Sequence, residues 1–330
     1  GVNHNGFLTI AKKMIDQASS IGADYVKFQS FNAAELASKS IKKANYQKIN
    51  SNNYESQFDM LKKLELNEEF HKKLIKYSIQ KKIKFLSSPF DITSLNILLG
   101  LGIKNIKIPS GEINNYPLLL EISKKSKEVI LSTGMASYKE ISNALKILIS
   151  NNLKKNKITI LQCTSDYPTK YQDVNLKVMN EYKKRYKTNV GISDHTLGIE
   201  VASAATALGA SVIEKHFTLN KKMAGPDHFV SLEPQEFKKM INSIRNIELA
   251  IGTHVKSLSI TERKTKKIVR KFVIANKKIS KDEYFTLDNL TTQRTGGGVE
   301  ANFYKKLLKK KSKKNYFKGQ KIQKCEISQL

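Results

Sequence analysis

Two histidines end apolar, strand-like runs that are neighbours along the chain. His195 ends the run that starts at Val190, and His216 ends the run that starts at Ala210. Imidazole suits borderline divalent ions, and side chains from two adjacent parallel strands can share one ion while leaving positions free for water and substrate. Either histidine alone is more simply a hydrogen-bonded strand-end residue. Their polar neighbours favour the interpretation that they are metal ligands.

Polar side chains also stand at the carboxyl ends of the other strand-like runs. A single Ser or Thr at such a place usually caps the following helix. Seven strand ends that all carry polar residues are hard to explain by capping, and lysines with hydroxyls suit a phosphate dianion. The residues are Lys27 and Gln29; Ser87 and Ser88; Lys107, Ser110 and Glu112; Ser132 and Thr133; Thr164, Ser165 and Tyr167; Ser193, Asp194 and His195; and His216.

The elements that must position these residues alternate between short β-branched runs and longer amphipathic stretches, which is typical of α/β folds. With a stub before Asn3, the strands number eight, which predicts a (β/α)8 TIM barrel over residues 1–255. A doubly wound open sheet is the alternative, but the first unit has no glycine-rich dinucleotide motif. The expected strands are 24–29, 83–87, 105–108, 128–132, 158–162, 189–193 and 211–215.

The composition excludes several classes of protein. The net charge of +29 comes mostly from Lys spread along the chain, and Arg, the usual reader of base edges, is scarce, so we do not expect nucleic-acid binding. No run is long and apolar enough to span a membrane. The two cysteines, Cys163 and Cys325, make no disulfide framework, so we expect a reducing, cytoplasmic location.

Nine sequence blocks resemble the sialic acid synthases, in the right order over almost the whole chain. They are NHNG (3–6), GADYVKFQ (22–29), SSPF (87–90), KIPSGEIN (107–114), LSTGM (131–135), CTSDYP (163–168), SDHT (193–196), EKHF (214–217) and GPDH (225–228). This resemblance implies an enzyme that condenses phosphoenolpyruvate with an N-acylated mannosamine-type sugar to give a nine-carbon 2-keto acid and phosphate. It also implies a barrel followed by a small antifreeze-like (SAF) domain, in a homodimer.

The tail fits that arrangement. We expect a linker at 256–267 and a small β-rich domain at 268–330, with strand-like pieces at 272–275, 278–283 and 318–322. In the family this domain reaches over the active site of a partner subunit, and an Arg touches the acylamino group of the sugar. Arg294 matches that Arg, although Thr295 stands where the family has Pro. A solvated loop residue is the alternative for Arg294.

The resemblance implies roles for individual residues. His195 and His216 would hold Mn2+ or Mg2+, which would polarise the sugar aldehyde, and Glu112 would stabilise positive charge at the former enol carbon. Glu112 could instead pair with a buried lysine, and Asp194 could orient a metal ligand or cap a helix. The remaining substrate-binding residues are Lys27, Ser88, Lys107, Ser110, Ser132 and Ser193 for phosphoenolpyruvate, Gln29, Tyr167, Asp227 and Arg294 for the sugar, and Ser165, which stands where relatives commonly have Asn or another small polar residue.

Some alternatives stay open at this level. The family has a catalytic-site Glu two residues before Gly1, so we expect that the first strand is truncated here. The sugar is either N-acetylmannosamine or 2,4-diacetamido-2,4,6-trideoxymannose, and the blocks lie nearer the neuraminate and legionaminate branches than the pseudaminate branch. Two other classes remain as competitors: a basic nucleic-acid-binding protein, and a metal-independent barrel aldolase with Lys27 or Lys107 as the Schiff-base nucleophile.

Overall fold

The computed structural model describes residues 1–41, 56–151 and 153–327 of the chain. The chain divides into two compact units, residues 1–252 and 253–330, so the division lies three residues before the expected boundary at 255. The helix α12, Ile260–Val269, occupies most of the segment expected to be a linker. Each unit has a hydrophobic core of its own.

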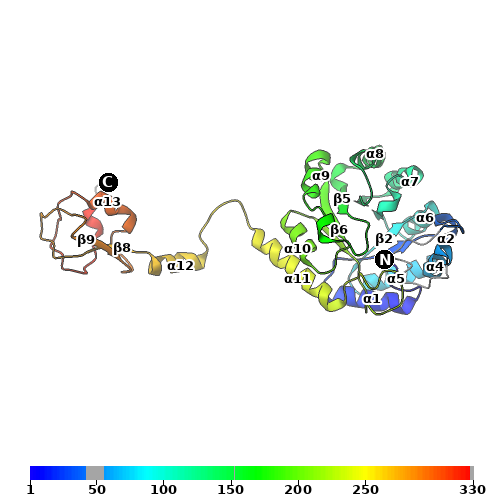
Figure 1. Ribbon diagram of the computed structural model, residues 1–330, viewed down its shortest axis with the longest axis horizontal. Helices are drawn as coiled ribbons and strands as arrows, with labels where there is room; N and C mark the ends of the chain where they lie inside the picture. Colours follow the sequence, from blue (N-terminus) through cyan, green and yellow to red (C-terminus); the bar gives the residue numbers. More distant parts are fainter. Residues whose placement is uncertain (42–55, 152, 328–330) are drawn as a thin grey trace. The chain divides into compact units, whose positions relative to one another are not determined.

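The first unit is built on a curled parallel sheet (Figure 1). Each strand pairs with the next one along the chain, and this sequential order excludes the doubly wound alternative, in which the strand order reverses. All seven strands expected after Asn3 are confirmed within about two residues. They are β1 Tyr25–Ser30, β2 Lys84–Pro89, β3 Asn105–Ile108, β4 Glu128–Ser132, β5 Ile158–Cys163, β6 Asn189–Asp194 and β7 Val212–Lys215.

The sheet has two edges, β1 and β7. The expected eighth strand before Asn3 is not among the strands of the described residues. Gly1 nevertheless lies between the two edges: its amino group donates to the carbonyl oxygen of Lys27 at 2.9 Å. A Cβ atom added to Gly1 would lie 3.7 Å from Nδ1 of His216, just after β7. The fold is therefore TIM-barrel-like, with the gap between its edges at this point.

Helices surround the strands of the first unit (Figure 1). Several begin at a side chain that accepts a hydrogen bond from the first turn: Asn67 and Asp91 accept from the amides of Phe70 and Ser94. None of the helices in the described part of the chain has the length and apolar character that a membrane span requires. The helices are α1 Leu8–Ser20, α2 Ala33–Leu36, α4 Gln57–Leu64, α5 Glu68–Gln80, α6 Ile92–Gly100, α7 Tyr116–Lys125, α8 Tyr138–Ile149, α9 Val178–Tyr186, α10 Glu200–Ala207 and α11 Pro234–Ile251.

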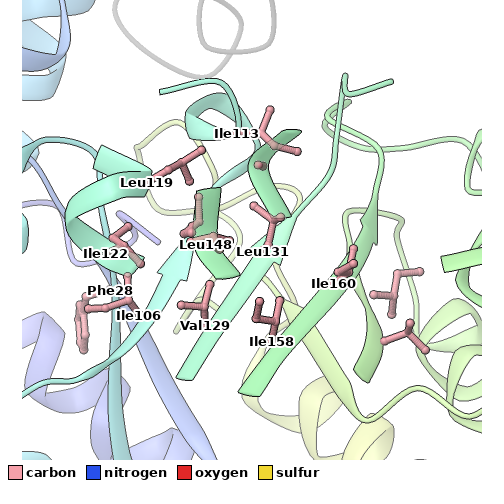
Figure 2. Packing of buried hydrophobic residues seen from close by; sticks show 14 of the residues in the cluster. Phe28, Ile106, Ile113, Leu119, Ile122, Val129, Leu131, Leu148, Ile158 and Ile160 are labelled. Atoms are coloured by element: carbon pink, nitrogen blue, oxygen red, sulfur yellow. The ribbon is translucent and has the colours of Figure 1, made fainter. Parts of the chain in front are cut away.

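The core of this unit lies between the strands and the helices. Figure 2 shows Val129, Leu131, Ile158 and Ile160 on β4 and β5 among the helix residues that pack with them. Because strand side chains alternate between two faces, the residues between these apolar positions point to the opposite, inner face of the curled sheet. That inner face carries Lys27, Lys107 and Ser132, whereas Ser87 and Thr133, also expected at the strand ends, bond on the helix-facing side to Ser30 and Tyr182.

The second unit is small and has little regular structure. Its strands β8, Phe272–Ala275, and β9, Leu290–Gln293, pair antiparallel, and one more helix, α13, spans Tyr304–Leu307. β8 confirms one expected strand, but 278–283 and 318–322 are wrong as strands: the described residues there form only isolated bridges. Lys-rich and Gly-containing stretches of this kind leave few apolar side chains to hold an extended ladder.

Candidate active site

Two lysines and a glutamate form a charged cluster on the inner face of the sheet. Lys27 on β1 and Lys107 on β3 reach Oε1 of Glu214 on β7, at 3.8 and 3.5 Å. Lys107 is only 2% exposed, and burial lowers its pKa while Glu214 opposes that shift. Burial alone would raise the pKa of Glu214, but the two lysines outweigh it and hold the pKa at about 2. Two cations share one carboxylate, so the cluster is suited to an additional anion.

Two hydroxyl groups, at the ends of β2 and β4, point to the same inner face of the sheet as this cluster. Oγ of Ser88, on β2, and Oγ of Ser132, at the end of β4, are buried and have no hydrogen-bond partner among the residues that the structure describes. Buried polar groups are normally satisfied, so such groups need an explanation. Ser193 on β6 is paired, since its hydroxyl donates to Oε1 of Glu214 at 3.1 Å. A ligand with acceptor oxygens would satisfy both free hydroxyls.

Ser110 belongs to a compact group at the neighbouring strand ends. Its Oγ accepts from the backbone amide of Gly134 at 2.9 Å and donates to Sγ of Cys163 at 3.6 Å. A Cβ atom added to Gly134 would lie 2.9 Å from the Ser110 hydroxyl, and it would lie closer still to Oγ of Ser165. The backbone must approach these side chains closely, so Gly134 is required there.

The two expected metal ligands lie together. The ring centroids of His195 and His216 are 5.3 Å apart, and the Tyr167 ring lies 4.2 Å from His195 and 5.6 Å from His216. Nδ1 of His195 is 2.7 Å from the carbonyl oxygen of Thr164, so Nδ1 donates and Nε2 is left as the acceptor. This geometry confirms that the two strand ends bring the imidazoles to one place.

The surroundings of His216 fit a metal ligand. Burial holds its pKa well below the ordinary value, so the ring is neutral, as metal binding requires. Nδ1 is buried and has no hydrogen-bond partner in the described part of the chain, and Oδ2 of Asp227 lies 3.5 Å from it. Across the described ranges, no group of three or more His, Cys, Asp or Glu side chains is arranged to hold an ion. An ion held here would therefore have two imidazole ligands and take the others from substrate and water.

Glu112 forms no ion pair with Lys27 or Lys107, both of which contact Glu214 instead. It lies in a short 3-10 turn, Ser110–Glu112, and accepts from Nδ2 of Asn115 at 2.6 Å. Burial raises its pKa, against the effect of that hydrogen bond. The sequence alternative that Glu112 is the counter-ion of a buried lysine is therefore wrong, because Glu214 has that place.

The residues expected to bind the sugar lie in three separate parts of the chain. Gln29 is half-buried on β1, two residues from Lys27 and on the same face. Asp227 is buried beside His216, and burial raises its pKa. Arg294 is exposed directly after β9, in the second unit.

A cavity of about 430 Å³ opens between the two sheet edges. Lys27, Glu214 and His216 line one part of it, and apolar residues of α11, including Met240 and Ile244, line another. The polar part adjoins the lysine and histidine groups, and the apolar part continues between the strands and helices.

Sequence reasoning missed Glu214. The signal was present: a carboxylate in the apolar run from Ser211 to His216, two residues before the histidine and so on the same face of the strand. A charge at such a position is costly to bury without partners. Its neighbours, the two lysines, come from strands far away in the sequence.

Comparison with known proteins agrees with this site. A model of the NeuB family matches residues 14–256. The chain is 51% identical to the N,N'-diacetyllegionaminic acid synthase of Campylobacter jejuni subsp. jejuni over 96% of this chain and 95% of that protein. It is 42% identical to the synthase of the same name from Legionella pneumophila, over 91% of this chain and 85% of that protein.

A solved structure agrees as well. The crystal structure of the N-acetylneuraminic acid synthetase of Leptospira borgpetersenii, in complex with citrate, superposes with a TM-score of 0.70 at 32% identity, covering 80% of this chain and 87% of that chain. The family model and these identities, taken with the shared fold, show that the chain belongs to the NeuB family of sialic acid synthases.

Proposed function

We propose that this chain condenses phosphoenolpyruvate with an N-acylated mannosamine-type sugar to form a nonulosonic acid and phosphate, as a transferase of surface-glycan precursor synthesis. We propose 2,4-diacetamido-2,4,6-trideoxymannose as the sugar and N-acetylmannosamine as the alternative. The names of the two relatives at 51% and 42% identity support this order. The relative named for N-acetylneuraminic acid supports the alternative.

The charged cluster would bind phosphoenolpyruvate. Lys27 and Lys107 would face its phosphate and carboxylate, and the free hydroxyls of Ser88 and Ser132 would donate to its oxygens. Ser110 and Ser193 would complete this set. Glu214 would keep both lysines in place and limit the positive charge before the substrate arrives. Pre-organised cations of this kind need little rearrangement when the anion binds.

The reaction forms one C–C bond and breaks one C–O bond. The methylene carbon of phosphoenolpyruvate attacks the aldehyde carbon of the open-chain sugar, and the aldehyde oxygen gains a proton. Glu112 would stabilise the positive charge that develops at the former enol carbon. Water then adds at that carbon, and phosphate leaves by C–O cleavage, which produces the 2-keto acid.

His195 and His216 would hold a divalent ion, Mn2+ or Mg2+. Such an ion acts as a Lewis acid that polarises the aldehyde of the sugar. Two imidazoles leave most coordination positions for sugar oxygens and water. The neutral state of His216 supports this assignment, and so does the ring of His195, whose Nδ1 is held by the Thr164 carbonyl and whose Nε2 points toward the Ser193 hydroxyl at 3.4 Å.

The sugar would lie on the histidine side of the site. Tyr167 packs against both imidazole rings, and Asp227 lies beside His216, so both can reach hydroxyl groups of a sugar held there. Gln29 would contact the sugar from β1, and Ser165, beside Ser110 and Gly134, would complete the set of substrate-binding residues. Arg294 would reach the acylamino group from the second unit of a partner chain in a cytoplasmic homodimer.

We also propose that the sheet closes into an eight-stranded barrel and that the second unit is an antiparallel β-containing SAF domain. The unpaired edges of β1 and β7 and the cavity between them support closure by one more strand. The short pair β8 and β9 supports the second assignment. Size-exclusion chromatography with light scattering tests whether the protein is a dimer. Mixing Arg294→Ala with a variant of the active site, such as Lys107→Met, tests the contact between partners, because a mixed dimer should regain one complete site.

The observation that carries the proposal is the meeting of the paired lysines, the free hydroxyls and the two histidines on one face of one sheet. Parallel assays with phosphoenolpyruvate, Mn2+ and each of the two sugars, with released phosphate as the readout, test it. We expect turnover with the diacetamido sugar to exceed that with N-acetylmannosamine. If neither sugar supports phosphate release, the proposal is wrong.

A Schiff-base aldolase is the second candidate, because burial lowers the pKa of Lys107 and so favours the neutral amine such chemistry needs. Its Nζ is committed to Glu214 and to the carbonyl oxygen of Ile108 at 3.3 Å, which opposes that role. Borohydride treatment in the presence of a keto acid separates the two candidates. Covalent trapping would favour the aldolase.

A further inference from the structure

A buried ion pair lies behind the two histidines, on the helix-facing side of the sheet. Nζ of Lys215 is 2.6 Å from Oδ2 of Asp194, and the two side chains are 1% and 0% exposed. They are register partners on adjacent strands, β6 and β7. In the chain, Asp194 directly precedes His195 and Lys215 directly precedes His216.

The same pair also fixes the residue that follows His195. Nζ of Lys215 donates to the carbonyl oxygen of Thr196 at 2.6 Å. Oδ1 of Asp194 accepts from the backbone amide of Thr196 at 2.9 Å and from its hydroxyl at 2.7 Å. His195 is thus held between two residues that are both tied to Lys215. Asp194 does not cap α10, whose N-cap is Ile199, so the capping alternative is excluded.

The alternation of strand side chains explains how this arrangement acts on the inner face. Ser193, His195, Glu214 and His216 face the interior, whereas Asp194 and Lys215 face the helices. The ion pair can therefore hold the two strand ends at one spacing without occupying the site. The orientation of the His195 ring is set separately, by its hydrogen bond to the Thr164 carbonyl.

Stability alone does not explain charges at these positions. Neighbouring helix-facing residues on the two strands are apolar, Ile192 and Ile213. A buried ion pair costs desolvation that a well-packed apolar pair avoids, so replacing both charges with apolar side chains is often neutral or stabilising. What an apolar pair cannot supply is the directed set of hydrogen bonds to the backbone and hydroxyl of Thr196.

We propose that Asp194 and Lys215 are positioning residues that set the distance between His195 and His216, and with it the affinity of the site for a divalent ion. This inference rests on the proposed function, since it concerns the same metal site. Neither residue touches the ion or the substrate. The pair acts through the backbone on both sides of His195 and through the residue before His216.

The double variant Asp194→Leu with Lys215→Met tests the role. Each single variant leaves a buried, unpaired partner and should lower the melting temperature, whereas the double variant should recover much of that loss. We expect the double variant to bind Mn2+ about 10- to 100-fold more weakly than the unchanged protein, in calorimetric titration or by electron paramagnetic resonance. At saturating Mn2+ its KM for phosphoenolpyruvate should be unchanged.

The control variant removes an exposed ion pair elsewhere in the unit whose N···O distance is similar. A guanidinium nitrogen of Arg245, on α11, lies 2.7 Å from Oδ2 of Asp24, the residue before β1. The double variant Asp24→Asn with Arg245→Met should leave the affinity for Mn2+ unchanged. If the double variant of Asp194 and Lys215 does not fold, Thr196→Val tests the same role. It keeps both charges but removes the hydroxyl that donates to Asp194. We expect it to bind Mn2+ more weakly too.

The outcomes separate this inference from the function beneath it. If the unchanged protein binds Mn2+ and the double variant or Thr196→Val binds it equally tightly, the positioning role is wrong and the proposed function stands. If the unchanged protein binds no Mn2+, the proposed metal site itself is wrong, and the positioning role is wrong with it.

Discussion

Nζ of Lys107 lies 3.5 Å from Oε1 of Glu214 across the inner face of the curled sheet. The two residues are more than a hundred positions apart in sequence and stand on β3 and β7. Lys27, on β1, shares the same carboxylate. One carboxylate thus orders two cations from two other strands, and the cluster keeps a net positive charge for an anionic substrate.

Replacing Lys107 with Met should greatly weaken the binding of phosphoenolpyruvate. Glu214 keeps Lys27 as a partner, so the fold should survive, but one of two cations facing the anion is lost. We expect kcat/KM for phosphoenolpyruvate to fall by about 100- to 1000-fold, the effect typical of losing one charged contact in a pre-organised site. Steady-state kinetics measure this. Lys104→Met, at an exposed position three residues earlier, should change nothing.

Removing the free hydroxyls should weaken binding without weakening the fold. Ser88→Ala or Ser132→Ala deletes a buried hydroxyl that no described residue hydrogen-bonds, so the free energy of unfolding should hardly change. Phosphoenolpyruvate affinity should fall about 10-fold or more, as expected for a hydrogen bond to a charged ligand.

Ser30 is the matched control for the hydroxyl variants. Its Oγ bonds to Nε2 of His71 at 2.6 Å and to Oγ of Ser87 at 2.7 Å. Ser30→Ala should therefore destabilise the fold by about 1 to 3 kcal/mol in urea unfolding. A similar loss of stability in Ser132→Ala would show that its hydroxyl has a structural partner after all.

Removal of divalent ions should abolish turnover reversibly. The expected result is a loss of more than about 100-fold in a chelator, recovery when Mn2+ is added back, and a comparable permanent loss in His195→Ala or His216→Ala. The readout is phosphate release. His254→Ala, at an exposed position, should behave like the unchanged protein. Full activity in chelator would contradict the two-histidine metal site.

Stability should fall as the pH falls below about 6.5, because His4 is buried as the neutral ring. Burial lowers its pKa from 6.5 to about 3, so in this range the unfolded chain binds a proton that the folded chain does not. The free energy of unfolding therefore decreases with decreasing pH, by about 2 kcal/mol from this one residue at pH 5.

Urea unfolding at pH 7.5 and pH 5 measures this dependence. His4→Asn should lose about 2 kcal/mol less between the two pH values than the unchanged protein does. His254→Asn, at an exposed position, should show the same loss as the unchanged protein. Equal losses in the unchanged protein and in His4→Asn would contradict the assignment of this proton to His4.

The sequence by itself determined the strands of the first unit and the end of the sheet that carries the polar residues. Periodicity of apolar side chains is a local signal, and the consecutive βα units favoured a barrel over a doubly wound sheet, which the strand order of the structure then excluded. The same signal predicted that His195 and His216 stand on neighbouring strand ends, and their rings are 5.3 Å apart. The signal was weaker in the second unit, where the strands predicted at 278–283 and 318–322 are wrong.

Only the tertiary structure decided how the charges pair. The spacing of residues along the chain could not tell whether Glu112 or Glu214 is the partner of the buried lysines, since the answer depends on which strands curl toward each other. Nor could it show that Asp194 binds Lys215 rather than capping a helix. Electrostatic partners are chosen by distance through space, and in a curled sheet that distance is set by strands far apart in sequence.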